Sequence, residues 1–549
     1  MSVIENPLAT IQDLFAKNWK QDQTTDKNEF GVTEHFQNLF DTREKLLQIP
    51  VLDAQSISTL PLNSLVRFRC MIQDTELSQE VALFATTVIS PPDGEEKLVC
   101  HRYSDGPHED HHLHTNPSEG IMDLRNAYYC VSVPGESQWV KEYERSKVAS
   151  LDAALNGLKL DSSEPHVIPE RYPFSGADHF AAVVKTHSSD VSIGVTDMVE
   201  VIGVLGASDK LASGDSFDFH DDSASGPRIP TVHAILMRKI EDHGHPGLGL
   251  NGRPEEADLQ CFSAEAATIR KDLIKYIASA VRGDELAAEL VLLHFLARIY
   301  SRPSGAVLGK FSLNLRDSSA NSPVYPNLAQ VMRNLLPKVH AMALSLQILN
   351  DNFFFPRGDE HLASGMLQVT RGTAFLLDET ALEEGTLVDK GLKNLKAVSD
   401  VSLYQTLSYV FPYNNLDFQT DISLLFVSNG NSLVPVDCAV TLSPGPLADE
   451  PGSEPTEEQL VLFRKYISVL RLAEYTFPES MAKEIEMEFM EQRKAAAVAG
   501  TSLITPNDLA FNISLARLVA LSYGEQTLTR QRWEHAVSLA KQIKGRGKQ

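Results

Sequence analysis

The spacing of the apolar residues divides the chain into stretches of different periodicity, which predict different secondary structure. Within the first 45 residues, apolar side chains recur three and four positions apart, which predicts helices. The residues that carry this pattern are Leu8, Ile11, Leu14, Phe15, Phe36, Leu39 and Phe40. Over residues 62–74 the period falls to two, which is typical of a strand. One face carries Leu65, Arg67, Arg69 and Met71, and the other carries Val66, Phe68, Cys70 and Ile72.

Further short strands are predicted as far as residue 240. They are rich in β-branched and aromatic residues and cover 81–89, 127–133, 179–187, 198–206 and 231–240. A polar connector over 144–170 interrupts them, as does an acidic, Ser- and Gly-rich stretch over 208–227 that predicts a flexible loop. Short strands joined by long loops favour a small β-barrel or β-sandwich from which acidic loops project.

The helical period returns after a Gly-rich turn over 243–256. Apolar residues one turn apart predict an amphipathic helix over 264–282, and 285–300 is apolar nearly all round, which predicts a buried helix. His294 lies within this second helix, where few charged residues surround it. A buried core position is its predicted role, in preference to catalysis.

Strands and helices then alternate. Strands are predicted over 311–315, 342–349, 373–380 and 423–429, with a helix over 327–336. This alternation is typical of an α/β unit with a largely parallel, buried sheet.

A linker over 444–455 separates this α/β unit from a helical end. Thr505 is a predicted N-cap, Pro506 suits the first helical position and Asp508 lies in the first turn. That helix is expected to stop near Gly524, and Thr529 is expected to cap the last one. The apolar face of the last helix carries Trp533, Ala536, Val537, Ala540 and Ile543.

Composition favours a soluble, acidic protein in a reducing compartment. The chain has 549 residues and a net charge of -24, which suits a basic partner surface better than bare DNA. Its five scattered cysteines form no C-x-x-C pair, which fits reduced thiols in the cytosol or nucleus. They are Cys70, Cys100, Cys130, Cys261 and Cys438. Neither a signal peptide nor an apolar run of about 18 residues is recognisable, so no membrane span is expected.

The sequence FLLDE raises the question of whether the protein hydrolyses a nucleotide. Four residues of a strand followed by Asp378 and Glu379 resemble a Walker B strand, in which the acids hold Mg²⁺ and orient a water. A phosphate loop needs G-x-x-x-x-G-K-[ST] directly after the first strand. No glycine occurs between Gly309 and Gly358, and the pair Gly309-Lys310 precedes the strand instead of following it. ATP hydrolysis is therefore not expected.

Two other groups of residues are weighed as binding sites. His101, His108, His111, His112 and His114 crowd a polar loop, and a solvated loop with only adventitious metal binding is favoured over a zinc site. The strand VRFRC offers Arg67, Phe68 and Arg69, a combination that single-strand-binding barrels use. The acidic loops favour a structural or protein-binding barrel instead. No catalytic, cofactor-binding or metal-binding residue is nominated.

Several of these stretches resemble the MCM complex-binding protein family. The resemblance covers nearly the whole chain, and its most specific blocks are PGESQWVKE over 134–142 and GMLQVTRGTAFLLDET over 365–380. Other matching stretches are NPLATIQDLFA, LNSLVRFRCMIQD, LAAELVLLHFLARIYSR, FRKYISVLRLAEYTF and TLTRQRWEHAVSLAKQ. Members of this family are nuclear proteins that bind subunits of the hexameric MCM helicase, which implies roles in its assembly, subunit stability and unloading.

A more distant similarity is to an MCM subunit itself. It implies an oligonucleotide-binding (OB)-like region, an AAA+-like core and a helical lid, with Asn429 where a sensor asparagine stands. The phosphate loop is missing, and Leu433-Val434-Pro435-Val436 replace the Ser-Arg-Phe expected after the sensor strand. No catalytic role is carried over to Asp378, Glu379 or Asn429, for which turn capping at the sheet end is expected.

The resulting fold class is a multidomain α+β protein, with N-terminal helices, an OB-like barrel region, a degenerate AAA+-like core and a helical lid. The predicted domains are an N-terminal helical segment (1–50), an OB-like region (51–242), a linker (243–263), the core (264–443), a second linker (444–458) and the lid (459–549). The predicted function is non-catalytic binding of MCM helicase subunits in DNA replication and sister chromatid cohesion, in the nucleus and without a cofactor. The alternatives are an ATP-dependent AAA+ remodelling factor and a single-stranded DNA-binding OB protein.

Overall fold

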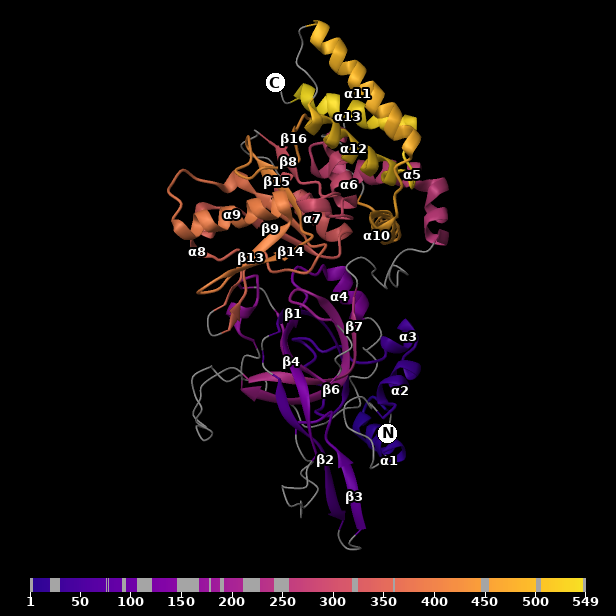
Figure 1. The fold of residues 1–549 in the computed structure, drawn as a ribbon, viewed down its shortest axis with the longest axis vertical. Coiled ribbons are helices and arrows are strands. Elements are labelled where there is room, and N and C mark those ends of the chain that lie inside the picture. Colours follow the sequence, from indigo (N-terminus) through magenta and orange to yellow (C-terminus); the bar gives the residue numbers. More distant parts are fainter. Residues whose placement is uncertain are drawn as a thin grey trace.

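The computed structural model describes most of the chain, in fifteen stretches. These are residues 3–19, 30–75, 77, 79–90, 95–105, 121–145, 167–176, 179–187, 192–210, 228–240, 256–317, 324–358, 361–445, 454–499 and 505–546. A β-rich half, an α/β half and a set of C-terminal helices follow one another along the long axis of the molecule (Figure 1). The acidic stretch 211–227 and most of the predicted linkers lie outside the described residues.

The β-rich half is built on a closed ring of strands. It contains β1 (Leu65–Asp74), β2 (Glu80–Ser90), β3 (Glu95–Cys100), β4 (Ile121–Ser132), β5 (Ala181–Thr186), β6 (Met198–Lys210) and β7 (Arg228–Lys239). Their order is β1-β6-β7-β5-β4-β2-β3, and β1 also pairs with β4, so the first five close on themselves. Only β5 and β7 pair in parallel, and β2 and β3 extend from the ring as an arm (Figure 1).

Helices cover the outside of this ring. They are α1 (Pro7–Asn18), α2 (Val32–Leu39), α3 (Arg43–Leu46) and α4 (Gln138–Arg145), with a short turn η2 (Pro169–Arg171). Ile11 and Phe36 of the predicted helical pattern are buried against Ile202 of β6 in one apolar cluster. The N-terminal helices therefore form one body with the ring.

The α/β half contains a five-stranded parallel sheet. Its strands are β8 (Leu313–Arg316), β9 (Val339–Ala343), β12 (Ala374–Asp378), β15 (Ser423–Ser428) and β16 (Cys438–Thr441), in the order β16-β8-β15-β12-β9. Every neighbouring pair is parallel, as the sequence predicted. Around it lie α5 (Glu256–Ala280), α6 (Glu285–Leu296), α7 (Val324–Leu335), α8 (Leu346–Asp351) and α9 (Asp389–Tyr404).

Two sequence predictions need adjustment here. The expected strand over 342–349 is wrong beyond residue 343, because Ser345 accepts a hydrogen bond from the backbone N–H of Ile348 and so starts helix α8. Its apolar run is too short for periodicity to separate strand from helix. From residue 256 onward, the segment predicted as a linker belongs to α5.

A second, small sheet lies beside the parallel one. It contains β10 (Arg357–Gly358), β11 (Leu362–Ala363), β13 (Thr406–Val410) and β14 (Asn415–Gln419). Its order is β11-β10-β13-β14, so β14 is the last strand on one side among the residues described. The sequence did not predict this sheet.

The C-terminal end is helical, as expected. It contains α10 (Glu457–Leu472), α11 (Glu479–Ala499), α12 (Pro506–Ser522) and α13 (Arg530–Arg546). Helices α10, α12 and α13 bury side chains in the same apolar cluster as α5, α6 and one face of the parallel sheet. The other face packs in a cluster that includes Tyr129 and Phe174 of the β-rich half, so the two halves share a core.

Candidate functional site

The acids of the FLLDE sequence are engaged by neighbouring turns. Asp378 ends β12, and its Oδ1 accepts hydrogen bonds from the backbone N–H and the hydroxyl of Thr380 at 3.0 and 2.5 Å. This is the turn-capping role that the sequence suggested. Asn429, the position compared with a sensor, is exposed just beyond the end of β15.

Glu379 is buried beside the loop that follows β15. Its Oε1 accepts hydrogen bonds from the Ser432 hydroxyl at 2.8 Å and the Leu433 backbone N–H at 3.3 Å. Burial raises the pKa of Glu379 to about 7, although these two donors lower it. Both donors come from the loop that follows β15, so this carboxyl oxygen is engaged by the protein itself.

Lys310 lies at the opposite end of the parallel strands from Asp378 and Glu379. It precedes β8 and forms an ion pair with Asp437, whose other oxygen accepts hydrogen bonds from the Ser312 backbone N–H at 2.8 Å and hydroxyl at 2.9 Å. Because β8 and β12 run parallel in one sheet, the amino end of β8 and the carboxyl end of β12 lie at opposite ends of the strands. Lys310 therefore cannot act with Asp378 on one phosphate group.

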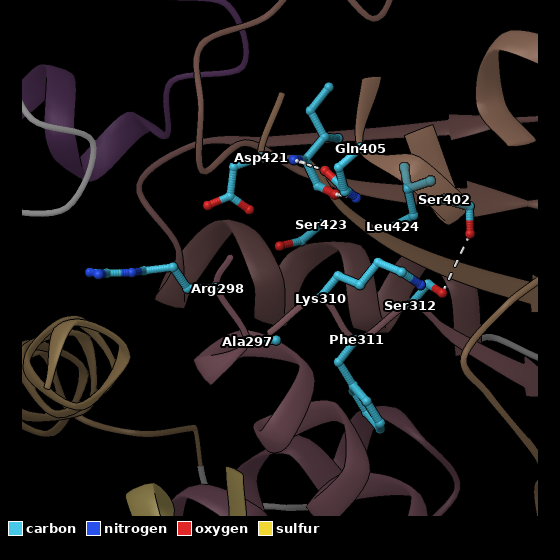
Figure 2. A pocket seen from close by; sticks show the side chains of 11 residues that line it. Ala297, Arg298, Lys310, Phe311, Ser312, Ser402, Gln405, Asp421, Ser423 and Leu424 are labelled. Carbon is cyan, nitrogen blue, oxygen red and sulfur yellow. Dashed lines mark hydrogen bonds between the residues drawn. The ribbon is translucent and has the colours of Figure 1, made fainter. Parts of the chain in front are cut away.

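A small polar cavity lies at the amino-terminal end of strands β8 and β15 (Figure 2). Lys310, Ser312, Gln405 and Asp421 contribute to its lining, and its volume is about 10 Å³. That volume suits a single water molecule. The cavity is too small for a nucleotide.

The arginines that the strand VRFRC offered to nucleic acid are used internally. Arg67 is 1% exposed and pairs with Glu144 at 2.5 Å and Glu200 at 3.1 Å, while Arg69 pairs with Glu144 at 3.1 Å. Burial alone would raise the pKa of Glu144, but Arg69, Arg67 and Arg43 hold it at about 2. This network joins α3, β1, α4 and β6, so its arginines do not form a strand-binding surface.

Phe68 points the other way, into the ring. It is 1% exposed, and its ring meets that of Phe180 edge-on with centroids 5.6 Å apart. Neither Phe68 nor the two arginines of VRFRC is therefore placed to bind a nucleic-acid strand.

The histidines and cysteines give no sign of a metal centre in the described part of the chain. His101 is buried with its Nε2 2.7 Å from the Thr86 hydroxyl, whereas His108, His111, His112 and His114 lie outside the described residues. His294 is buried in α6 as predicted, with Nδ1 2.6 Å from the Phe311 carbonyl, and burial lowers its pKa to about 4. Within the described ranges no three His, Cys, Asp or Glu side chains are grouped as metal ligands.

The described cysteines are free thiols. Cys70, Cys130 and Cys438 are buried and Cys100 is half-buried, while the side chain of Cys261 lies outside the described residues. Burial raises the pKa of Cys100 to about 11 and that of Cys438 to about 12. Such thiols are unreactive at neutral pH.

The block PGESQWVKE lies at the junction between the two halves. The Ser137 backbone N–H donates to the Pro337 carbonyl at 2.8 Å and its hydroxyl donates to the Leu336 carbonyl at 2.6 Å. The Val339 N–H in turn donates to the Gly135 carbonyl at 2.7 Å. Gly135 has a φ of +71°, and a Cβ there would lie 3.1 Å from the Val339 oxygen, so glycine is required.

The block GMLQVTRGTAFLLDET meets the same junction. The Gln73 side-chain amide donates to the Leu362 carbonyl at 2.7 Å, and the Gln368 amide donates to the Gln73 carbonyl at 3.1 Å. Lys338, next to the first block, donates to the Thr370 hydroxyl at 2.9 Å. The two stretches most specific to the resemblance therefore hold the two halves together.

One groove lies at this junction, and another lies between α5, α7 and α10. The first, of about 600 Å³, is lined by Trp139, Glu142 and Arg333 among others, and the second, of about 640 Å³, by Asp272 and Lys275 among others. Their mixed polar lining differs from the mainly apolar lining of small-molecule sites. In the described residues, no helix has the length and apolar character needed to cross a bilayer.

These features define a class of protein: a two-part α+β scaffold in which the candidate nucleotide-site acids accept hydrogen bonds from the protein's own turns. The sequence model of a family described as "Mini-chromosome maintenance replisome factor" matches residues 36–164 and 152–546. The chain belongs to this family.

Curated relatives cover nearly the full length. Proteins named mini-chromosome maintenance complex-binding protein are 28% identical in Gallus gallus, over 98% of this chain and 96% of the relative, and 27% identical in Homo sapiens, over the same shares. The Arabidopsis thaliana protein of that name is 26% identical over 94% of each chain. The spacing of apolar residues does not predict the junction contacts of Trp139, Gln73 and Gln368; the PGESQWVKE and GMLQ blocks contain two of these residues, Trp139 and Gln368.

Proposed function

We propose that this protein is a non-catalytic binding protein of the hexameric MCM helicase. The observation that carries this proposal is membership of the family over residues 36–164 and 152–546, in which the relatives bear the name of MCM complex-binding proteins. Its roles would be assembly, subunit stabilisation or unloading of the helicase in replication and cohesion, in the nucleus.

The mechanism proposed is mimicry of a helicase subunit. A closed ring of β1, β6, β7, β5 and β4 supports the OB-like assignment, because OB folds are five-stranded barrels. In the parallel sheet the strands lie in the order fifth, first, fourth, third, second along the chain, which is the order of AAA+ cores. A scaffold of this shape would pair with an unassembled subunit as a neighbouring subunit does.

The positions of the charged residues support an ATP-independent mode. The carboxylates of Asp378 and Glu379 accept hydrogen bonds from the hydroxyls of Thr380 and Ser432. Asp437 pairs with Lys310 at the opposite end of the parallel strands. The ATP-dependent alternative needs these groups on one phosphate, and the single-strand alternative needs Arg67 and Arg69 at the surface. The sequence FLLDE motivates the first alternative and VRFRC the second, but the side chains that each would use are engaged within the protein.

The test is co-elution of the purified chain with each purified MCM subunit in turn. At micromolar concentration we expect a complex with at least one subunit in the absence of nucleotide, and an unchanged complex when Mg-ATP is added. An interface of this kind buries at least about 1,200 Å². Failure to co-elute with every subunit would overturn the proposal, and a complex that forms only with ATP would favour the remodelling alternative.

A further inference from the structure

Strand β14 presents an open edge to solvent. Residues 412–419, which include the whole strand, are all exposed, and Tyr413 at the turn before it is 100% exposed. β14 pairs with β13 on one side only, and among the described residues no strand pairs with its other side. An uncovered edge strand is a template for a further strand, and proteins usually protect it.

The free main-chain groups of this edge can be assigned. The Phe411 N–H donates to the Asn414 carbonyl at 2.9 Å, and the Thr420 N–H donates to the Gln405 carbonyl at 2.8 Å. Hydrogen-bonded and non-bonded pairs alternate along an antiparallel ladder. In the observed register, Leu416 and Phe418 therefore bond to β13, while the N–H and C=O groups of Asn415, Asp417 and Gln419 point outward.

The two faces of the edge differ in chemistry. Leu416 and Phe418 share a face with buried Leu407 and Tyr409 but are themselves 45% and 37% exposed, so the apolar cluster continues to the edge without a cover. The other face carries Asp417, whose side chain accepts a hydrogen bond from Ser408.

The polar face is acidic. Burial raises the pKa of the nearby Asp400, and the Asp417 carboxylate raises it further, while Lys396 acts in the opposite sense. None of the five residues of β14 is basic. The protective lysines that are common on edge strands are thus absent from this one.

We propose that β14 is a docking edge that accepts an extended segment of a helicase subunit as an additional strand. The segment would place a lysine or arginine opposite Asp417 and apolar residues on either side of it, over Leu416 and Phe418. Main-chain hydrogen bonds supply affinity in such strand addition, and the alternating side chains supply specificity. This inference rests on the proposed function for the identity of the partner.

A second copy of this chain fits the edge less well. Antiparallel pairing of two β14 strands over their full length places the two Asp417 carboxylates opposite each other, and like charges directly opposite are destabilising. The net charge of -24 adds to this repulsion. A basic partner segment meets neither obstacle.

The test compares three substitutions at one position in the full-length chain. Asp417→Ala removes the side chain and keeps the outward N–H; Asp417→Pro also removes that N–H without breaking a bond to β13; Asp417→Lys reverses the charge. For the MCM subunit that the wild-type chain binds, we expect affinity within about threefold for Ala and at least about tenfold weaker for Pro and Lys. Proline binding as tightly as alanine would overturn strand addition, and lysine binding as tightly as alanine would overturn the basic partner residue.

Hydrogen exchange on the wild-type complex provides a readout that needs no variant to fold. The amides of Asn415, Asp417 and Gln419 point outward, so we expect them to exchange rapidly in the isolated chain and to gain protection on binding. Unchanged exchange there would overturn the inference even if the proline variant is unstable. A wild-type chain that forms a dimer lost in Asp417→Pro would assign the edge to self-association instead.

These outcomes separate the two proposals. If the wild-type chain binds a subunit, the proline variant binds it equally well and the three amides stay unprotected, then only the docking edge is overturned. The proposed function is unaffected by that result. Absence of wild-type binding to every subunit removes both.

Discussion

The guanidinium of Arg464 lies 4.6 Å from the centre of the Trp139 ring. Trp139 belongs to α4 of the β-rich half, and Arg464 belongs to α10 at the other end of the chain. The Arg464 Nε also donates to the Asn334 carbonyl at the end of α7, at 2.7 Å. One arginine thus links the α/β half, the C-terminal helices and the PGESQWVKE block.

Removal of the Trp139 ring should loosen this junction. Trp139→Ala deletes a partly buried aromatic surface and its cation–π contact, and we expect the free energy of unfolding to fall by about 2 kcal/mol or more. Denaturant unfolding followed by fluorescence and circular dichroism measures the change. The neighbouring Gln138 is exposed, so Gln138→Ala is the matched control. Equal stability of the two variants would contradict the role given to Trp139.

The network around Glu144 should make stability fall in acid. Its folded-state pKa of about 2 lies below the ordinary 4.5, so its contribution is present above pH 4.5 and is lost as the pH falls toward 2. Glu144→Gln leaves buried Arg67 with only Glu200 as a charge partner, and we expect a loss of about 3 kcal/mol in the free energy of unfolding at pH 7, together with a weaker dependence of stability on pH in acid. Unfolding free energies measured between pH 3 and 7 give both quantities.

The exposed pair of Lys393 and Asp389 provides the control for this experiment. Its side chains are 61% and 82% exposed, so Asp389→Asn should leave stability and its pH profile unchanged. If Glu144→Gln behaves like this control, then the ion pairs of Glu144 do not stabilise the fold, and the role given to this network is wrong.

Periodicity predicted the elements where one pattern ran for a full element. The strands predicted over 311–315, 373–380 and 423–429 correspond to β8, β12 and β15, and the predicted buried helix with His294 corresponds to α6. Strand β16 was not predicted, and β9 overlaps the strand predicted over 342–349 only at its end. The strand predicted over 342–349 was wrong beyond residue 343 because its apolar run is too short to separate strand from helix, and Ser345 caps helix α8 there. The sheet with β14 was missed because its exposed strand buries nothing and so leaves little apolar pattern.

The partners of charged residues could not be read from local sequence. Arg67 and Arg69 have the same alternating pattern whether they face DNA or face Glu144, which lies 77 residues from Arg67. Long-range pairs of this kind depend on where α4 packs. For Asp378 and Glu379 the sequence predicted turn capping, but it did not identify Ser432, 53 residues from Glu379, as a hydrogen-bond donor to Glu379.

The helix cap at Thr505 is a case in which local sequence was sufficient. The Asp508 backbone N–H donates to the Thr505 hydroxyl oxygen at 3.2 Å, and the Asp508 carboxylate accepts from the Thr505 N–H at 2.9 Å, a reciprocal capping box. Thr505→Ala should cost about 1 kcal/mol, measured as a shift of the denaturant midpoint. Thr505→Ser keeps the hydroxyl and should restore most of the loss; no recovery would place the effect outside the cap.

Glu379 should give the opposite pH dependence from Glu144. Its folded-state pKa of about 7 lies above the ordinary 4.5, so its favourable contribution is fully present below pH 4.5 and is lost as the pH rises through 7. Glu379→Gln keeps an oxygen that accepts from Ser432 and Leu433 but never ionises. We expect the variant to have a higher unfolding midpoint than the wild-type chain at pH 8, and the difference to shrink as the pH falls toward 5.

The matched control for Glu379 is Glu383→Gln, since Glu383 is exposed a few residues further on and should not alter the profile. ATP turnover measured on the same proteins distinguishes the two readings of the FLLDE strand. A structural Glu379 predicts the pH-dependent gain in stability with no turnover in the wild-type chain or the variant. Turnover in the wild-type chain that disappears in Glu379→Gln would instead make Glu379 a catalytic residue and overturn the non-catalytic function proposed for the scaffold.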